Sequence, residues 1–156
     1  MNNPYQTPVA NLQDAAMASE VRYAGFWMRT AASIIDSILI LMVTWPMLIW
    51  VYGLDYFTDA RLFKGLPEVL ISYVLPAIAV IVFWIYRSAT PGKMALSIRI
   101  ADARTGAPCS TGQLIGRYFA YYVSMLPLML GFIWVGIDKR KQGWHDKLAG
   151  TVVVRD

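Results

Sequence analysis

Cysteine and histidine are nearly absent from this sequence, which limits the metal and redox chemistry open to it. The 156 residues contain one of each, Cys109 and His145. One thiol excludes an intrachain disulfide. One histidine beside one carboxylate offers too few ligands for a metal ion, and the sequence shows no nucleophile paired with a base. We therefore expect no cofactor, no metal and no enzymatic activity.

Charged residues are scarce as well. They make up 15% of the chain, against 57% hydrophobic residues, whereas soluble domains contain about 25% charged residues. The mean hydropathy is +0.45. The net charge of +4 does not form a basic stripe on a soluble helix, so nucleic acid is excluded as a partner. These features predict an integral membrane protein whose main partner is the lipid bilayer.

The first 20 residues, MNNPYQTPVANLQDAAMASE, do not form a signal peptide. They lack both the basic region and the apolar region that such a peptide requires. We expect residues 1–22 to form a polar, mobile tail. Residues 23–154 then form the membrane domain, and its first apolar run is an uncleaved anchor.

Three long apolar runs dominate the rest of the chain: Phe26–Tyr52, Val69–Tyr86 and Leu114–Ile137. About 20 apolar residues cross a bilayer core as a helix, so each run has a length suited to a span. Tryptophan and tyrosine gather near the ends of the first two runs, as in interfacial aromatic belts. The expected fold class is an all-α membrane protein with three hydrophobic helical segments.

Two short segments outside these runs have the character of strands. Ser97–Ala101 alternates apolar and polar residues, which is the period of a strand. Thr151–Val154 is rich in β-branched residues. We expect both to be strands that pair in a small cytoplasmic β element, provided that they lie on the same side of the membrane.

The basic residues leave the number of crossings open. Three full crossings place seven lysines and arginines on each side, a tie that the positive-inside rule disfavours. A re-entrant third run that turns near residues 127–131 instead places the N-terminal tail, the second loop and the C-terminal segment in the cytoplasm. With either topology we expect a multi-pass protein of the cell membrane, the inner membrane of a bacterium, with a cytoplasmic N-terminus.

Asp36 lies in the middle of the first run, seven residues after Arg29. Seven residues return to almost the same face of a helix and rise roughly 10 Å along it. A charge at this depth costs ~2.5 kcal/mol or more. Arg29 is long enough to snorkel to the interface, but Asp36 is too short to do so. We therefore expect Asp36 to belong to an ion path or to an obligatory intramembrane pair.

Other charged candidates lie near the third run and after it. Arg117, near the start of that run, is interpreted first as an interfacial anchor and second as a partner for Asp36. His145 and Asp146 are interpreted as a polar clasp at the membrane face, next to Arg117 or to Lys93. Lys93 follows a turn and is expected at the level of the headgroups. Proton transfer is the alternative for His145, because an unperturbed histidine titrates near pH ~6.5.

Three stretches together resemble the RDD family of small membrane proteins, which is named for one arginine and two aspartates. The stretches are GFWMRTAASIIDSILI, TPGKMALSIRI and DKRKQGWHDKLAGTVVV, and the resemblance covers about residues 23–154. It implies that Arg29 and Asp36 are the family's arginine and first aspartate. Asp146 is then the second aspartate, with Asp138 as the competing choice.

The family is largely uncharacterised, and the resemblance implies small-ligand transport or cation/proton exchange. In a transporter Asp36 would bind a cation or a proton, and a homo-oligomer would supply the missing helices. The alternative is a non-transporting scaffold or accessory subunit, which binds a partner membrane protein and uses the charges structurally. Both readings place function in one charge network, whose expected members are Arg29, Asp36, Arg117, Asp138, His145 and Asp146.

Overall fold

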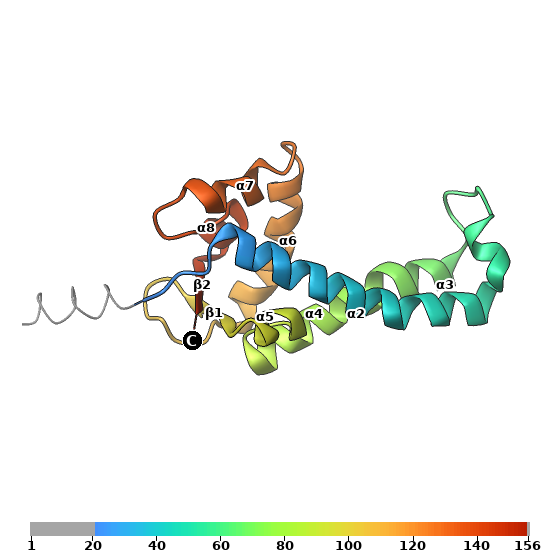
Figure 1. The fold of residues 1–156 in the computed structure, drawn as a ribbon, viewed down its shortest axis with the longest axis horizontal. Helices are drawn as coiled ribbons and strands as arrows, with labels where there is room; N and C mark the ends of the chain where they lie inside the picture. Colours follow the sequence, from blue (N-terminus) through green and yellow to red (C-terminus); the bar gives the residue numbers. More distant parts are fainter. Residues whose placement is uncertain (1–20, 156) are drawn as a thin grey trace, which may run out of the picture.

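The computed structural model describes residues 21–155. The mobile tail predicted for the N-terminus lies, over residues 1–20, outside the described residues. Figure 1 shows an elongated molecule in which two long helical segments extend along its length. Shorter helices and a small sheet gather around one end of these segments, on the left in this view.

Helix α2 is the first segment long enough to cross a membrane. It spans Phe26–Tyr52, and its 27 residues match the first apolar run. The helix ends at Gly53, whose φ of 74° lies in the left-handed region that glycine adopts without a steric penalty. Many large apolar side chains of α2 are exposed, among them Trp50 at 88%. A continuous apolar surface of this kind is typical of a membrane-embedded helix.

The second such segment is a helix of 22 residues, Leu66–Arg87, which begins slightly before the predicted run. Pro76 has no backbone N–H to donate and its ring crowds the preceding turn, and a wider π-helical turn lies directly before the helical stretch that contains it. The loop that connects α2 to this segment contains a short 3₁₀ helix. The bounds are η1 (Leu54–Phe57), α3 (Leu66–Val69), the π-helical η2 (Leu70–Val74) and α4 (Leu75–Arg87).

The third apolar run is divided between two helices. These are α6 (Thr111–Met125) and α7 (Leu130–Ile137), and the chain bends by 101° between them. Leu128 and Met129, which follow Pro127 in the break, have φ values of 52° and 60° and so cannot continue a right-handed helix. By length and composition the described chain has two helices able to cross a membrane, or three if the bent pair is one span.

The two expected strands are confirmed, and they pair with each other. Strands β1 (Ile98–Asp102) and β2 (Thr151–Arg155) form an antiparallel sheet in which Ile100 lies opposite Val153. Tyr23, just before α2, forms an isolated bridge with Val154. The start of α2, the segment after α4 and the last strand therefore meet at one end of the molecule.

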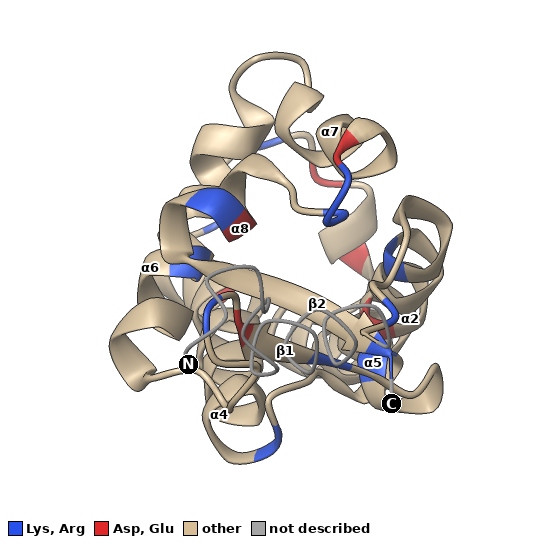
Figure 2. Ribbon diagram, turned by 90° about the vertical axis from the view of Figure 1, so that its left-hand side faces the viewer, with Lys and Arg blue, Asp and Glu red and all other residues tan. Residues whose placement is uncertain are grey.

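The hydrophobic core lies at this same end. Two short helices, α5 (Pro91–Ala95) and α8 (Trp144–Ala149), precede β1 and β2. Figure 2 looks onto this end and shows basic and acidic residues on the ribbons around the sheet. Charged residues thus gather at the end where the short helices and the sheet pack together. The core side chains are each at most 1% exposed: Trp84, Ile98, Ile100, Leu114 and Val153.

Candidate functional site

A buried aspartate joins three helices at the sheet end of the molecule. Asp146 lies in the first turn of α8 and is 0% exposed. Its Oδ2 atom forms an ion pair with Nη1 of Arg29 from α2, and its Oδ1 atom lies 2.7 Å from Nη1 of Arg117 from α6. The backbone N–H of Gly143 also donates to this carboxylate, at 3.0 Å. These three charged residues are termed the Arg–Asp–Arg network below.

The backbone also fixes the orientation of Arg29. Its Nη2 atom donates to the carbonyl oxygen of Lys141 at 2.6 Å, and its Nε atom donates to that of Ala24 at 3.1 Å. A guanidinium presents its donors in a rigid fork, so these contacts aim the remaining donor at Asp146. The side chain is only 11% exposed. Arg29 therefore does not snorkel to the interface, and that interpretation of the sequence is wrong.

Arg117 is the most deeply buried cation of the network. It is 1% exposed, and its Nη1 atom also donates to Oγ1 of Thr151 in β2 at 2.9 Å. Its Nε atom is buried and has no hydrogen-bond partner among the described residues. The interpretation of Arg117 as an interfacial anchor is wrong, because α6 packs against α8 and turns this side chain inward. Its carboxylate partner is Asp146 and not Asp36.

The two arginines determine the charge state of Asp146. Burial disfavours the charged form of a carboxyl and so raises its pKa. The positive charges of Arg117 and Arg29 outweigh that effect and hold the pKa of Asp146 well below its usual range. Asp146 is therefore a carboxylate at neutral pH, although no water reaches it.

His145 packs beside the network as a neutral ring. Its Nδ1 atom lies 3.2 Å from Oγ of Ser124, and its ring centroid lies 4.3 Å from that of Tyr121 and 5.0 Å from that of Phe132. Burial lowers the pKa of His145 to about 3, although the charge of Asp146 acts in the opposite direction. The histidine is thus uncharged at neutral pH.

Lys93 lies in the same region without a carboxylate partner among residues 21–155. It is 6% exposed, so its side chain is buried in the protein and is not open to the surface. Its Nζ atom lies 5.1 Å from the centroid of the Trp84 ring. Burial lowers the pKa of Lys93, and the charge of Arg117 lowers it further.

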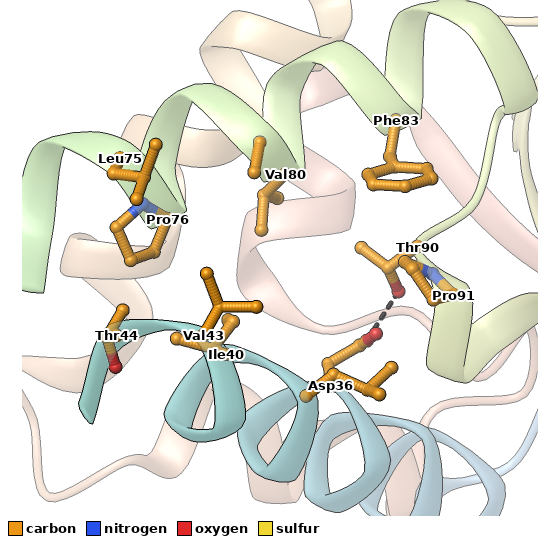
Figure 3. Close-up of a pocket in the computed structure, with 12 residues that line it drawn as sticks. Asp36, Ile40, Val43, Thr44, Leu75, Pro76, Val80, Phe83, Thr90 and Pro91 are labelled. Carbon is orange, nitrogen blue, oxygen red and sulfur yellow. Dashed lines mark hydrogen bonds between the residues drawn. The ribbon is translucent and has the colours of Figure 1, made fainter. Parts of the chain in front are cut away.

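Asp36 lies apart from the Arg–Asp–Arg network and has other partners. Its Oδ2 atom accepts a hydrogen bond from Oγ1 of Thr90, and its Oδ1 atom accepts one from the backbone N–H of Gly92 at 2.7 Å. Figure 3 shows Asp36 pointing from α2 toward Thr90. Thr90 is the N-cap residue of α5. A carboxylate from α2 thus binds the first turn of another helix, where backbone donors are otherwise unpaired.

Helix α5 reaches Asp36 because residue 92 is a glycine. A Cβ atom at Gly92 would lie 2.2 Å from the carbonyl oxygen of Ala32 and 2.9 Å from Cγ of Asp36. No side chain larger than hydrogen fits at that distance. The turn before Lys93 that the sequence predicts, Thr90–Gly92, is therefore the contact by which α5 docks on α2.

Two cavities adjoin these contacts. The first has a volume of about 180 Å³ and lies between α2 and α4, where Asp36 and Thr90 line one side and apolar residues such as Phe83 line the rest (Figure 3). The second is larger, about 510 Å³, is partly open, and is lined by residues of α2, α5, α6, α7, α8 and the break between α6 and α7. We term it the network cavity. Its polar lining consists of Arg29, Thr30, Ser33, Lys93, Arg117, Tyr121 and His145.

The structure thus divides the expected charge network. Arg29, Arg117, His145 and Asp146 lie together, whereas Asp36 binds α5 as described above. Asp138 lies at the end of α7 and pairs with Lys147 at 2.6 Å, outside the Arg–Asp–Arg network. Within residues 21–155, no group of three His, Cys, Asp or Glu side chains is placed to hold a metal ion.

Sequence reasoning missed several partners in this region. Thr151, in β2, contacts both Arg117 and Asp146, and the hydroxyl of Tyr121 lies 3.5 Å from Nη2 of Arg117. Tyr121 lies one helical turn after Arg117 and Thr151 lies five residues after Asp146, but by residue type each looks like an ordinary belt or strand residue. The pattern of residue types around them carries no signal for such a contact.

Comparison with known proteins places the chain in a family. The RDD family matches residues 23–150. The chain is 31% identical over 150 residues to the uncharacterised protein YxaI of Bacillus subtilis (strain 168), covering 84% of this chain and 96% of that protein. It is 37% identical over 75 residues to the uncharacterised protein RP437 of Rickettsia prowazekii (strain Madrid E), covering 48% of this chain and 41% of that protein. No solved structure matches. The match spans nearly all of the described chain, and this protein therefore belongs to the RDD family.

Proposed function

We propose that this protein is a multi-pass protein of the cell membrane in which α2 and Leu66–Arg87 cross the bilayer and the bent pair α6–α7 re-enters it. The pairing of β1 with β2 supports this topology. Three full crossings would place these two strands on opposite faces of the membrane. The loop between the two spans has two basic residues, Arg61 and Lys64. The positive-inside rule therefore favours the cytoplasm for the opposite face, which holds the N-terminus and the sheet.

Cysteine labelling with a membrane-impermeant maleimide tests this topology. In a Cys109→Ser background, single cysteines replace three exposed residues: Leu62, Ala107 and Arg155. We expect positions 107 and 155 to label from the same face and position 62 to label from the other. Labelling of positions 107 and 155 from opposite faces would exclude the re-entrant pair.

For the function itself, we propose that this protein binds a small ligand at the end of its membrane domain. The observation that carries the proposal is the network cavity, about 510 Å³ in volume and lined by both charged and apolar side chains. Small-molecule sites are typically concave and mostly apolar, with a few convergent polar groups. The Arg–Asp–Arg network joins α2, α6 and α8, and so holds the walls of this cavity in place.

Native mass spectrometry of protein purified in a neutral detergent tests ligand binding. Ser33 lines the network cavity, and its side chain forms no hydrogen bond to the other described residues, whereas Ser37, one turn later, lies outside the cavity. Both serines are exposed. We expect a bound small molecule on the wild type and on Ser37→Phe, but not on Ser33→Phe. An adduct present on all three proteins, or on none, contradicts the proposal.

A second function, cation/proton exchange, is favoured by the position of Asp36. Its carboxylate lines the cavity between α2 and α4, in the part of the molecule that would lie in the bilayer. A carboxylate that exchanges a proton for a cation meets the minimal requirement of such a reaction. A homo-oligomer would supply the remaining walls of the path, because one protomer has few helices.

Flux measurements in proteoliposomes test the exchange function. A proton gradient should drive sodium or potassium flux in the wild type and in Asp138→Asn, and this flux should be lost in Asp36→Asn. Absence of flux in the wild type, or equal flux in Asp36→Asn, would remove this function.

The remaining reading is a scaffold or accessory subunit that holds a partner membrane protein. It is favoured by the hydrogen bonds of the Asp36 carboxylate, because each of its oxygen atoms accepts one from α5 or its N-cap residue. A scaffold requires neither an adduct nor flux. In that case Asp36→Asn and Arg29→Gln lower the melting temperature in detergent and have no other measurable effect.

A further inference from the structure

The network cavity contains more positive than negative charge. Arg29, Lys93 and Arg117 all line it. Among residues 21–155 the carboxylate that pairs with these cations is Asp146. His145 adds no charge at neutral pH, since burial keeps it neutral. The carboxylate of Asp36 is engaged by Thr90 and Gly92 and forms no ion pair with the cluster.

Such an excess is costly in a buried site unless another anion is present. Buried charges in proteins are almost always paired, because removing an ion from water carries a large free-energy penalty. Lys93 is 6% exposed and has no carboxylate partner among the described residues, and the Nε atom of Arg117 is buried without an acceptor. Two separate cations therefore retain unused donor capacity at the wall of one cavity.

We propose that the network cavity is an anion site that binds the phosphate group of a small ligand between Arg29, Lys93 and Arg117. This inference rests on the ligand-binding function proposed above and names the chemistry of its ligand. Arginine and lysine together are the usual partners of phosphate, the first through a rigid donor fork and the second as a compact charge. The hydroxyl of Tyr121, which also lines the cavity, supplies a further donor.

The phosphate group has two possible sources, a lipid headgroup and a free phosphate. Leu128 and Met129, in the break between α6 and α7, line the cavity and are 87% and 53% exposed. An acyl chain would have an apolar surface to follow at this position, so the two sources require separate experimental arms.

Thermal melting of the full-length protein in a neutral detergent tests the proposal. The probes are inorganic phosphate, short-chain phosphatidylglycerol, short-chain phosphatidylcholine as the zwitterionic control, and chloride at matched ionic strength. A ligand that binds only the folded state raises the melting temperature. We expect phosphatidylglycerol, inorganic phosphate or both to raise it above the values in chloride and phosphatidylcholine. Stabilisation by phosphatidylglycerol alone identifies a headgroup site, and stabilisation by inorganic phosphate identifies a site for the free anion.

Variants of Lys93 test whether the anions bind in the network cavity. We expect Lys93→Gln to weaken apparent anion affinity by about tenfold or more, the loss of one charge-assisted contact, without breaking an ion pair. Lys93→Arg should retain binding, and so should Lys139→Gln, which removes the same charge from an exposed site outside the cavity.

Three results would overturn the anion site. They are no stabilisation by either phosphate source, equal stabilisation of Lys93→Gln and wild type, and equal loss in Lys93→Gln and Lys139→Gln. An adduct that Ser33→Phe removes, combined with no response to the anions, would leave the ligand-binding function standing and refute only its anionic chemistry. Absence of both would refute the two proposals together.

Discussion

Asp146 and Asp138 are both aspartates paired with basic side chains in the C-terminal segment, yet their surroundings differ. Asp146 is fully buried between two guanidinium groups, whereas Asp138 lies at the surface end of α7 beside the half-exposed Lys147. A buried ion that loses its partner cannot regain water, but a surface ion can. The same Asp→Asn substitution at the two positions therefore measures how burial changes the contribution of one carboxylate to the free energy of unfolding.

We expect Asp146→Asn to lower the free energy of unfolding by about 3–5 kcal/mol, because Arg29 and Arg117 lose the carboxylate that they share. Asp138→Asn should cost about 0–1 kcal/mol, as is usual for surface pairs. Chemical denaturation in a mild detergent, followed by tryptophan fluorescence, measures both. Equal effects of the two substitutions would show that the network does not stabilise the fold.

His145 makes stability depend on pH. The pKa of His145 is about 3 in the folded protein and about 6.5 in an unfolded chain. Between these values the unfolded state binds an additional proton, so stability falls as the pH falls, by about 1.4 kcal/mol per unit. Above pH ~6.5 the histidine is neutral in both states and contributes no slope.

Melting of wild type and His145→Gln from pH 7.5 to pH 4.5 checks this prediction. We expect the wild-type melting temperature to fall below pH ~6.5 and that of His145→Gln to fall less steeply. The depressed pKa of Asp146 also reduces stability in acid, but only below the unfolded value of about 3.9. Parallel curves for the two proteins would refute the assignment of the slope to His145.

At the scale of elements, the position of α5 depends on two features of α2. Asp36 supplies an acceptor for the first turn of α5, and the backbone at Ala32 approaches Gly92 closely. Neither feature fixes the helix alone, because the hydrogen bonds require the short distance that the glycine permits. The contact carries α5, and with it Lys93, to the wall of the network cavity.

Gly92→Ala should therefore destabilise the protein, by about 1–3 kcal/mol, as is usual when a methyl group is forced into a packed contact. Gly112→Ala is the control, because a Cβ atom there meets nothing within 4 Å. That change lies in helix α6 and should be neutral or slightly stabilising. Thermal melting of both variants decides the point, and a neutral Gly92→Ala would contradict the docking contact.

At the scale of the whole molecule, the sheet links three distant parts of the chain. β2 pairs with β1, bridges to Tyr23 before α2, and supplies Thr151 to Arg117. The strand thus binds the start of the first long helix to the segment after the second. The relative placement of the two long helices depends on the last residues of the chain.

Truncation tests that dependence. A chain that ends after Gly150 loses β2, whose Val152 and Val153 are 3% and 0% exposed; each buried valine contributes about 1.5–3 kcal/mol. We expect this chain to aggregate or to be digested by protease in detergent. A chain that ends after Val154 keeps these contacts and should behave as wild type. Resistance of the shorter chain would show that the sheet is dispensable.

The sequence predicted the elements well and their contacts poorly. Periodicity and composition identified α2, the second long segment and both strands, because such patterns are local. The sequence did not decide whether the third apolar run bends between α6 and α7, although Pro127 marked the position of a possible turn. Arg117 was assigned to the interface because its depth in the protein depends on α8, which lies far away in the chain. Family resemblance identified Arg29 and Asp146 in two separate stretches as characteristic charged residues, but it did not show that they form an ion pair.

The sequence by itself determined that this chain is a membrane protein of the RDD family, since apolar length and the spacing of a few charged residues are readable without a fold. Only the tertiary structure decided which charges meet. Asp36 faces α5, and Asp146 faces two arginines from α2 and α6. The physical reason is that a buried ion is stabilised by its nearest partners in space, and the bend of α6–α7 and the pairing of β1 with β2 set those distances.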